Sequence, residues 1–224
     1  MKRLLAIAIL ILMAVASWGQ DAGAVLKEFS GKVEVMLPGG AWKPAVKGMA
    51  IPRNASVSTG FKSLAVLALG SSSLTVKPLT KLTLEEIAKA SGNETITLYL
   101  NAGRVSAKVA PPAGGSTDFS VKSPSATASV RGTEFDFDSF NLEVSDGMVV
   151  FFGADGQAVT VSMGGSSSVG VGGSALTQLQ SAYAELAPLL PAGIDEASFA
   201  SLVKTGGDLL VALAAAGVRV TLSW

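Results

Sequence analysis

The chain of 224 residues contains no cysteine and no histidine. Without cysteine it can form no disulfide, no zinc–thiolate site and no thiol nucleophile. Without histidine it also lacks the commonest metal ligand and the commonest general base. The many serines therefore have no histidine partner, and no Ser-x-x-Lys is followed by a plausible second catalytic element. We predict that the protein is not an enzyme, has no catalytic residue, and binds no metal and no cofactor.

An excess of one charge is also missing. The sequence has 17 basic and 17 acidic residues. Loss of Lys2 and Arg3 with a leader would leave 15 against 17, a net charge of −2. A nucleic-acid binder is expected to present a basic face, and Lys and Arg form no cluster here. We expect no nucleic-acid partner.

The N-terminus has the three regions of a secretory signal peptide. Lys2 and Arg3 precede an apolar run from Leu4 to Val15, and small residues follow, so cleavage after Ala16 or Gly19 is expected. The rival is a retained membrane anchor, but the run is shorter than the roughly 20 residues that a spanning helix needs. No cysteine lies near the cleavage region, which excludes a lipoprotein. We assign residues 1–19 to the signal and expect no membrane span in the mature chain, which is then exported.

The next 140 or so residues form short alternating runs separated by Gly, Pro, Ser and Asn, which predicts an all-β fold: a two-layer sandwich, a jelly roll or a solenoid. We place this β domain at residues 25–163. The expected strands are Val25–Phe29, Lys32–Leu37, Ser56–Ser58, Ser63–Leu69, Ser73–Val76, Lys81–Leu84, Glu94–Leu100, Gly103–Val109, Asp118–Lys122, Thr127–Val130, Thr133–Asp138, Asn141–Ser145, Gly147–Phe152 and Ala158–Ser162. Gly31, Gly103 and Gly147 each open a run that contains valine, but their unequal spacing predicts no regular repeat.

The stretch from Ala126 to Asp138 is the least ordinary of these runs. From Thr133 onward apolar and acidic residues alternate, so Phe135 and Phe137 are expected in the core, and Glu134, Asp136 and Asp138 in solvent. The same alternation would bury Arg131. A bulge at Gly132 would restore it to the acidic face, where Glu134, Asp136 or a strand-end carbonyl could pair with it. The three acids could alternatively offer oxygen ligands to calcium, but a solvated strand face is favoured because alternate positions spread them too far apart.

Val130-Arg131-Gly132-Thr133-Glu134-Phe135 resembles the V-R-G-T-x-F signature of the FecR protein family. Other pieces of that domain follow in the family's order, so the resemblance runs from roughly Val25 to Val169. They are Gly31–Val35, Trp42 with Gly48, Val57–Gly60, Ala65–Ser71, Leu79–Leu84, Gly103–Val105 and Asp146–Val150. The resemblance independently implies an all-β, two-layer domain with solenoid-like turns. We interpret the signature residues Val130, Arg131, Gly132, Thr133 and Phe135 as structural, with Arg131 as a ligand-binding cation the alternative.

The residues after the β domain change character. The stretch 164–174 has the composition of a flexible Gly/Ser linker. It also matches G-x-G-x-x-A, but no βαβ unit follows, so a dinucleotide site is not expected. We interpret residues 175–224 as a helical tail that ends in a short strand.

Within that tail, Ser174 could cap a helix with an apolar stripe from Leu176 to Leu190, and Pro188 would close it. Asp195 could cap a second helix, with a hydrophobic staple from Ile194 to Phe199. Gly206-Gly207 would end that helix. A third helix is expected from Asp208 to Ala216 and a final strand over Val218–Trp224, which would pair with the β domain or with a partner.

The best known FecR proteins, the resemblance implies, carry the periplasmic sensory part of a regulator that relays receptor occupancy to a sigma factor. We find no cytoplasmic segment ahead of the hydrophobic run and therefore expect only the binding half of that role. The expected function is an exported binding module in the periplasm that engages another envelope protein or an envelope polymer. The alternative is a structural or assembly subunit of the envelope. The sequence names neither the binding residues nor the oligomeric state.

Overall fold

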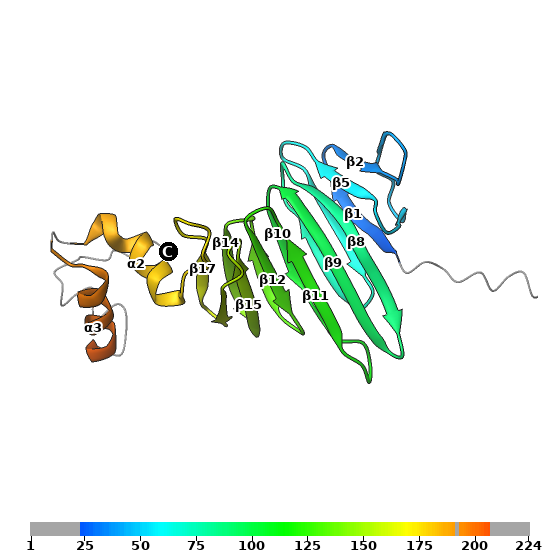
Figure 1. Cartoon of the computed structure of the whole chain (residues 1–224). Coiled ribbons are helices and arrows are strands. Elements are labelled where there is room, and N and C mark those ends of the chain that lie inside the picture. The colour runs from blue at the N-terminus through cyan, green and yellow to red at the C-terminus, as the bar shows by residue number, and fades with distance from the viewer. Residues whose placement is uncertain (1–22, 191–192, 207–224) are drawn as a thin grey trace, which may run out of the picture.

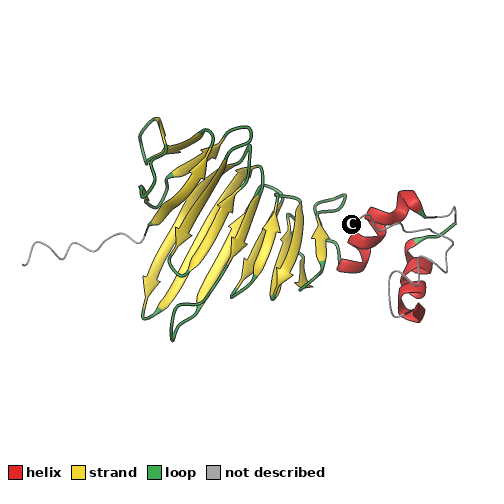
Figure 2. Cartoon of the chain, turned by 180° about the vertical axis from the view of Figure 1, so that it is seen from behind, coloured by secondary structure: helices red, strands yellow, loops and turns green. Residues whose placement is uncertain are grey.

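The computed structural model describes residues 23–190 and 193–206. The predicted signal peptide, the third helix and the final strand lie outside the described residues. The described chain is a β-sandwich followed by a small helical part (Figure 2). The predicted two-layer β fold with a helical appendage is therefore confirmed.

Seventeen strands of the described chain form two sheets. The eight-stranded sheet has the order β17-β14-β13-β10-β7-β6-β1-β4, and the nine-stranded sheet has the order β16-β15-β12-β11-β9-β8-β5-β2-β3. Their bounds are β1 Ala24–Ser30, β2 Val33–Met36, β3 Trp42–Pro44, β4 Ala50–Ile51, β5 Ser56–Thr59, β6 Leu64–Leu69, β7 Ser72–Val76, β8 Lys81–Ala90, β9 Asn93–Ala102, β10 Val105–Lys108, β11 Thr117–Lys122, β12 Ala126–Val130, β13 Glu134–Phe137, β14 Asn141–Asp146, β15 Met148–Gly153, β16 Ala158–Ser162 and β17 Ser166–Ser168.

The chain builds the sandwich progressively. After β5 it places β6 and β7 in one sheet, β8 and β9 in the other, and continues to alternate in this way to β17. Figure 1 shows the result: colours run from blue at one end of the sandwich to yellow at the other. All strand pairs are antiparallel except β9 with β11. The sandwich therefore combines two layers with the stepwise advance of a solenoid, two of the three arrangements that the sequence left open.

The core lies between the sheets and is filled by the apolar residue of each alternating pair. Phe119 packs edge-on against Phe135 at 6.3 Å between ring centroids, and Phe137 packs on Phe151 at 6.0 Å. Each pair joins one sheet to the other. All four rings are at most 1% exposed, which confirms the core position predicted for Phe135 and Phe137. Such edge-to-face pairs add about 0.5–1.5 kcal/mol beyond the apolar area they bury.

The prediction of one bulged strand through Gly132 is wrong. β12 ends at Val130 in the nine-stranded sheet, and β13 begins at Glu134 in the eight-stranded sheet. Arg131, Gly132 and Thr133 form a corner that carries the chain from one layer to the other. Gly132 has φ +147°, a conformation that disfavours L side chains. The alternation is interrupted at Gly132, as predicted. A corner between the sheets keeps Arg131 out of the core as well as a bulge would.

Three strands lie outside the predicted set: β3, β4 and β17. Of these, β17 corrects the linker prediction, because Ser166–Ser168 pairs antiparallel with β14 inside the stretch 164–174. Val169 and Ala175 form a further isolated bridge. A serine-rich composition predicts a flexible segment, but here the backbone of Ser166–Ser168 forms the edge strand of a sheet.

Two helices and a 3₁₀ turn follow β17: α2 Gln178–Leu186, η2 Ala187–Leu189 and α3 Glu196–Gly206. Thr177, and not the predicted Ser174, caps α2 through a capping box with Gln180. Pro188 lies in η2, where α2 has ended.

The predicted cap of α3 is present, because the backbone N–H of Ser198 donates to Asp195 Oδ1 at 2.8 Å. Phe199 is buried against Tyr183 of α2, at 5.5 Å between ring centroids. The helices that the structure describes are all too short or too polar to cross a membrane.

Candidate functional site

The corner at the signature is closed by Thr133. This residue is 3% exposed, and its Oγ1 donates to the carbonyl oxygen of Met148 at 3.0 Å. Its backbone N–H and carbonyl both bond to Val109. A Cβ on Gly147 would lie 2.8 Å from the carbonyl oxygen of Gly132, so only glycine fits opposite the corner. These contacts hold Thr133 in the corner, and the structural role interpreted for it from the sequence stays a prediction.

Two further corners of the sandwich repeat this arrangement. Ser63 Oγ accepts from the backbone N–H of Lys32 at 2.8 Å, and Thr80 Oγ1 accepts from that of Arg104 at 3.0 Å. In each case the hydroxyl bonds to the backbone of the residue that follows a glycine of positive φ. These glycines are the ones that the sequence singled out: Gly31, Gly103 and Gly147. The irregular echo in the sequence is thus a recurring structural device.

Arg131 differs from its signature neighbours because its side chain makes none of the contacts that close the corner. Its side chain is exposed, and within the described chain it makes no hydrogen bond or ion pair. The partners predicted for it are engaged elsewhere: Glu134 pairs with Lys108 at 3.2 Å, and Asp136 accepts from Ser106 at 3.5 Å. The corner turns the guanidinium away from the acidic face, so the expected pairing is wrong.

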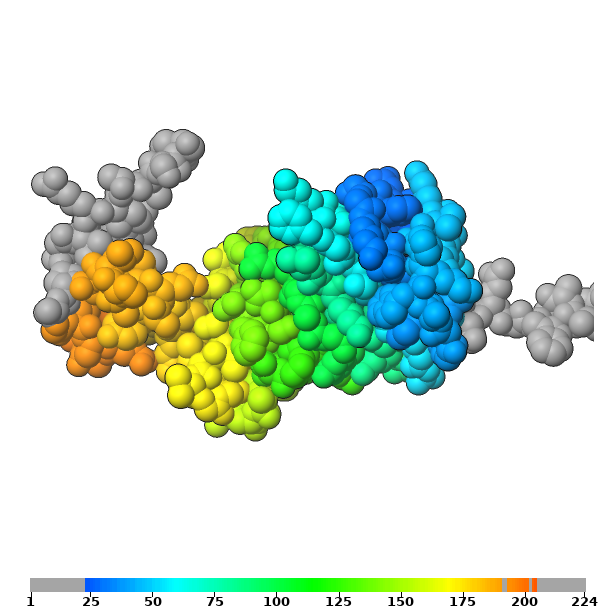
Figure 3. All heavy atoms as spheres, turned by 90° about the horizontal axis from the view of Figure 1, so that it is seen from above, coloured from blue at the N-terminus to red at the C-terminus, as the bar shows by residue number. Residues whose placement is uncertain are grey.

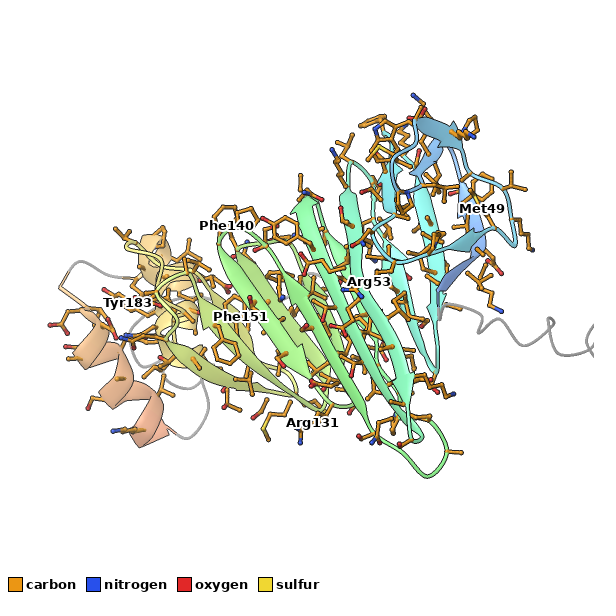
Figure 4. All side chains as sticks on the ribbon, turned by 45° about the vertical axis from the view of Figure 1, so that its right-hand side comes forward. Met49, Arg53, Arg131, Phe140, Phe151 and Tyr183 are labelled. Carbon is orange, nitrogen blue, oxygen red and sulfur yellow. The ribbon has the colours of Figure 1, made fainter. Side chains whose placement is uncertain are left out.

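Arg131 stands instead at the mouth of a groove of about 920 Å³ on the outer face of the nine-stranded sheet. The groove is lined by residues of β11, β12 and β15 and by the corner itself. Met148 is 57% exposed and Val150 36% exposed, and Phe152 continues their row along β15. Figure 4 shows Arg131 at the lower end of the strands. We call the surface formed by Arg131, Met148, Val150 and Phe152 the signature groove.

The apolar row is unusual for its place. The opposite face of β15 is buried in the core through Val149 and Phe151, so this strand is apolar on both faces. Its outer neighbours are polar, because Val150 pairs with Ser129 on one side and with Thr160 on the other. A strand with one solvated face normally alternates apolar and polar residues. The run Met148–Phe152, apolar at five successive positions, is the sequence signal of this surface.

The acidic face lies on the eight-stranded sheet, away from the groove. Asp138 pairs with Arg104 at 2.9 Å, so each of the three predicted acids has its own partner. Among the described residues no group of three or more acidic side chains converges to hold a metal ion. The favoured interpretation, a solvated strand face, agrees with this geometry.

The pKa of Asp138 reflects its surroundings. Partial burial acts to raise the pKa, but hydrogen bonds from Asn141, Arg104 and the backbone of Phe140 outweigh it and lower the pKa below its ordinary value. Asp138 also lines a smaller polar cavity of about 310 Å³ that extends to Glu185 of α2. Because its one cation, Arg104, is already paired with Asp138, we regard the signature groove as the stronger candidate site.

Fold and groove together define a two-sheet β-sandwich whose inter-sheet corner opens into an exposed apolar groove. Residues 55–154 match the model of the FecR protein family. The resemblance to the FecR family inferred from the signature is therefore confirmed over this part of the chain. The matched range contains the corner, the whole signature and the groove residues. FecR proteins are regulatory, non-enzymatic proteins associated with envelope signalling.

Two crystal structures, at 1.65 and 2.50 Å resolution, are similar to part of the chain. Both are of a "putative anti-sigma factor" from Parabacteroides distasonis ATCC 8503. The sequence identity is 15%, the TM-score is 0.44, and the match covers 54% of this chain and 57% of that one. The chain thus spans just over half the length of this protein, and the likeness is too distant to transfer a function. No curated protein matches the chain.

Proposed function

We propose that the protein is an exported, non-enzymatic binding module that engages another protein of the bacterial envelope through the signature groove. The FecR domain supports the envelope context. The leader-like N-terminal sequence supports export. The observation that carries the proposal is the apolar row Met148, Val150 and Phe152 beside Arg131, which has no ion-pair partner among the described residues.

Burial of this row would supply the driving force for binding. Apolar surface removed from water contributes roughly 25 cal/mol per Å². The strands beside the row present polar side chains and do not cover it, so a partner can bury it. Arginine and aromatic side chains dominate the binding energy of many interfaces, and here Arg131 stands at one end of the row and Phe152 at the other. An acidic group on the partner would meet the Arg131 guanidinium at the end of the row.

The spacing of the row fits an extended segment. Met148, Val150 and Phe152 alternate along β15, so neighbouring members are about 6.4–6.8 Å apart. An extended peptide presents alternate side chains with the same period, as in strand-like recognition. We therefore expect the partner to contribute an extended apolar stretch that carries a carboxylate at the end over Arg131.

Site-specific photo-crosslinking in the cell tests the proposal. A photoreactive residue at Val150, in the groove, should give a discrete adduct with an envelope protein. The same residue at Glu143, exposed on the outer face of the other sheet, is the matched control and should give none. The adduct at Val150 should disappear when Arg131→Ala is added. Equal adducts at both positions, or none at Val150, would count against the groove.

A structural subunit of the envelope is the second candidate, and one observation favours it. Within the described chain, β16 pairs only with β15, so its other edge is free to extend the sheet with a neighbouring copy. Light scattering on the purified protein separates the two functions. Concentration-dependent oligomers that Val159→Pro in β16 abolishes would favour the subunit, whereas a monodisperse monomer favours the binding module.

A further inference from the structure

A second surface lies at the opposite end of the strands, independent of the signature groove. Successive turns at this end carry an exposed apolar residue at their tip: Phe61 is 73% exposed, Leu79 63%, Phe140 54% and Val171 fully. Figure 4 shows Phe140 at the upper end of the strands and Arg131 at the lower end. Figure 3 looks onto the upper edge, along which the colours advance from blue to yellow. We call these four residues the apolar tips.

Hydrogen bonds tie neighbouring tips together. The N–H of Leu79 donates to the carbonyl of Gly60, beside Phe61, at 3.2 Å. Leu79 and Phe140 line one shallow hollow of about 390 Å³. The N–H of Val169 donates to the carbonyl of Phe140 at 2.9 Å. The tips therefore form one row along the edge of a rigid sandwich, and they project from separate turns.

The backbone at these tips is in an unfavourable conformation. Five non-glycine residues of the described chain have positive φ, and three of them are here: Lys62 at 51°, Leu79 at 55° and Ser139 at 81°. Left-handed backbone costs free energy for residues other than glycine, and leucine has no polar side chain to offset it. At Leu79 this conformation presents an apolar side chain to water. Folding alone does not explain such a cost.

Basic residues surround the tips. The turns of this edge and the residues that flank them carry six cations: Lys32, Lys62, Lys77, Lys81, Arg104 and Lys122. Three of them are paired: Lys32 with Glu34 at 3.1 Å, Arg104 with Asp138 at 2.9 Å and Lys122 with Glu85 at 3.3 Å. Within the described chain the other three, Lys62, Lys77 and Lys81, make no ion pair, while Asp155 accepts hydrogen bonds from Ser174 and the backbone of Gln157. The chain as a whole has no charge excess, so the basic character is local to this edge.

We propose that this edge docks on an anionic lipid surface. Separate apolar points flanked by lysines suit a headgroup layer, which receives each tip individually while the ammonium groups stay at the phosphates. A protein partner would instead favour one contiguous apolar core with charges kept at its rim. Docking by the upper edge leaves the signature groove, at the lower edge, free for a protein. The proposal does not depend on the function assigned to that groove.

Vesicle co-sedimentation tests the proposal. The chain from Gln20 to Trp224 is used, so that the apolar leader cannot itself bind lipid. It should sediment with phosphatidylcholine vesicles that contain about 30% phosphatidylglycerol, at least ten-fold more than with pure phosphatidylcholine, because both charge and apolar insertion are required. Binding to the anionic vesicles should weaken in high salt.

Two variants assign the binding to the edge. Leu79→Asp combined with Phe140→Asp should lower binding to anionic vesicles at least ten-fold. Met163→Asp, at a residue 66% exposed near the opposite edge, is the matched control and should leave binding unchanged. Circular dichroism checks that both variants fold. Failure of the unmodified chain to prefer anionic vesicles, or equal loss in both variants, would overturn the proposal. The proposal would also be overturned if the Leu79→Asp, Phe140→Asp variant still bound anionic vesicles and lost only the photo-crosslinked adduct with an envelope protein.

Discussion

The hydroxyl of Thr133 bonds at 3.0 Å to the carbonyl oxygen of Met148, and this contact joins the two sheets of the sandwich. Thr133 stands just before β13 in one sheet, and Met148 is the first residue of β15 in the other. Met148 also begins the apolar row of the signature groove. The same bond therefore fixes the corner and one end of the candidate binding surface.

Removal of this hydroxyl should destabilise the fold. Thr133→Val keeps the shape of the side chain but leaves the Met148 carbonyl without its partner, so we expect a loss of about 1–2 kcal/mol in the free energy of unfolding. Thr133→Ser retains the hydroxyl and should lose less. Urea denaturation of the three proteins measures the difference. Equal stability of the valine variant and the parent would show that the contact contributes nothing.

Gly147 should tolerate alanine worse than a glycine in open space. Both Gly147 and Gly156 have φ +81°, but nothing lies within 4 Å of a Cβ at Gly156. Gly156→Ala should therefore cost about 1 kcal/mol for backbone conformation alone. Gly147→Ala adds a clash with the Gly132 carbonyl and should cost about 1–2 kcal/mol more. Chemical denaturation of the pair, whose backbone strain is matched, isolates the clash.

At the corner itself, Gly132→Val should destabilise more than Arg131→Lys. The valine must adopt φ +147°, which costs about 1–3 kcal/mol, whereas the lysine keeps an exposed charge. The Cβ has free space, so conformational strain is the whole cause. Thermal melts of both variants measure it. A valine variant as stable as the parent would mean that the corner relaxes easily.

The stability contributed by Asp138 should depend on pH in a defined direction. Its pKa in the folded protein lies below the ordinary value of 3.8, so the ionised carboxylate stabilises the fold above that value. The contribution is lost as the pH falls through the lowered pKa. Asp138→Asn should therefore be less stable than the parent at pH 7, and the gap should close below about pH 4. Urea midpoints at several pH values test this, and a gap that is constant from pH 7 to pH 3 would contradict it.

Truncation after Gly173 should lower the soluble yield and the melting temperature, whereas a flexible linker at residues 164–174 would predict little effect. Ser167 Oγ donates to the carbonyl of Leu176 at 2.6 Å, and the N–H of Ser168 donates to Ser181 Oγ at 3.2 Å. Removal of α2 breaks both bonds and exposes the edge of β17. A cut after Leu190 keeps them and should leave the sandwich soluble and close to its original melting temperature. Soluble yield and thermal melts of the two truncations decide whether α2 belongs to the domain.

The sequence was sufficient for the elements whose apolar pattern has the right period. All fourteen strands expected from alternation are present, because polar-out and apolar-in positions report directly which face meets the core. β3 and β4 have two or three residues, too few to show a period. β17 consists of three serines, so it carries no apolar signal at all. Thr177 and not Ser174 caps the helix. Both residue types can cap, and the choice between them depends on the hydrogen bond that Ser174 makes to Asp155, which the local sequence does not show.

The candidate site was less predictable for a physical reason. The alternation of apolar and polar residues shows a break next to Arg131. Such a break can be a bulge within a strand or a corner between sheets. That choice depends on which strands lie alongside, and the local sequence does not contain it. The apolar run of β15 was visible, yet its outer face becomes a surface only once its neighbours Ser129 and Thr160 are known to be polar.

The role of Arg131 is the central claim, and Arg131→Ala tests it most directly. The melting temperature of this variant and its Val150 photo-adduct are measured together. The account predicts a melting temperature within about 2 °C of the parent, because the side chain makes no bond within the described chain, and loss of the adduct. A melting temperature lower by 5 °C or more with the adduct intact would contradict it, and would show that Arg131 stabilises the corner instead of binding a partner.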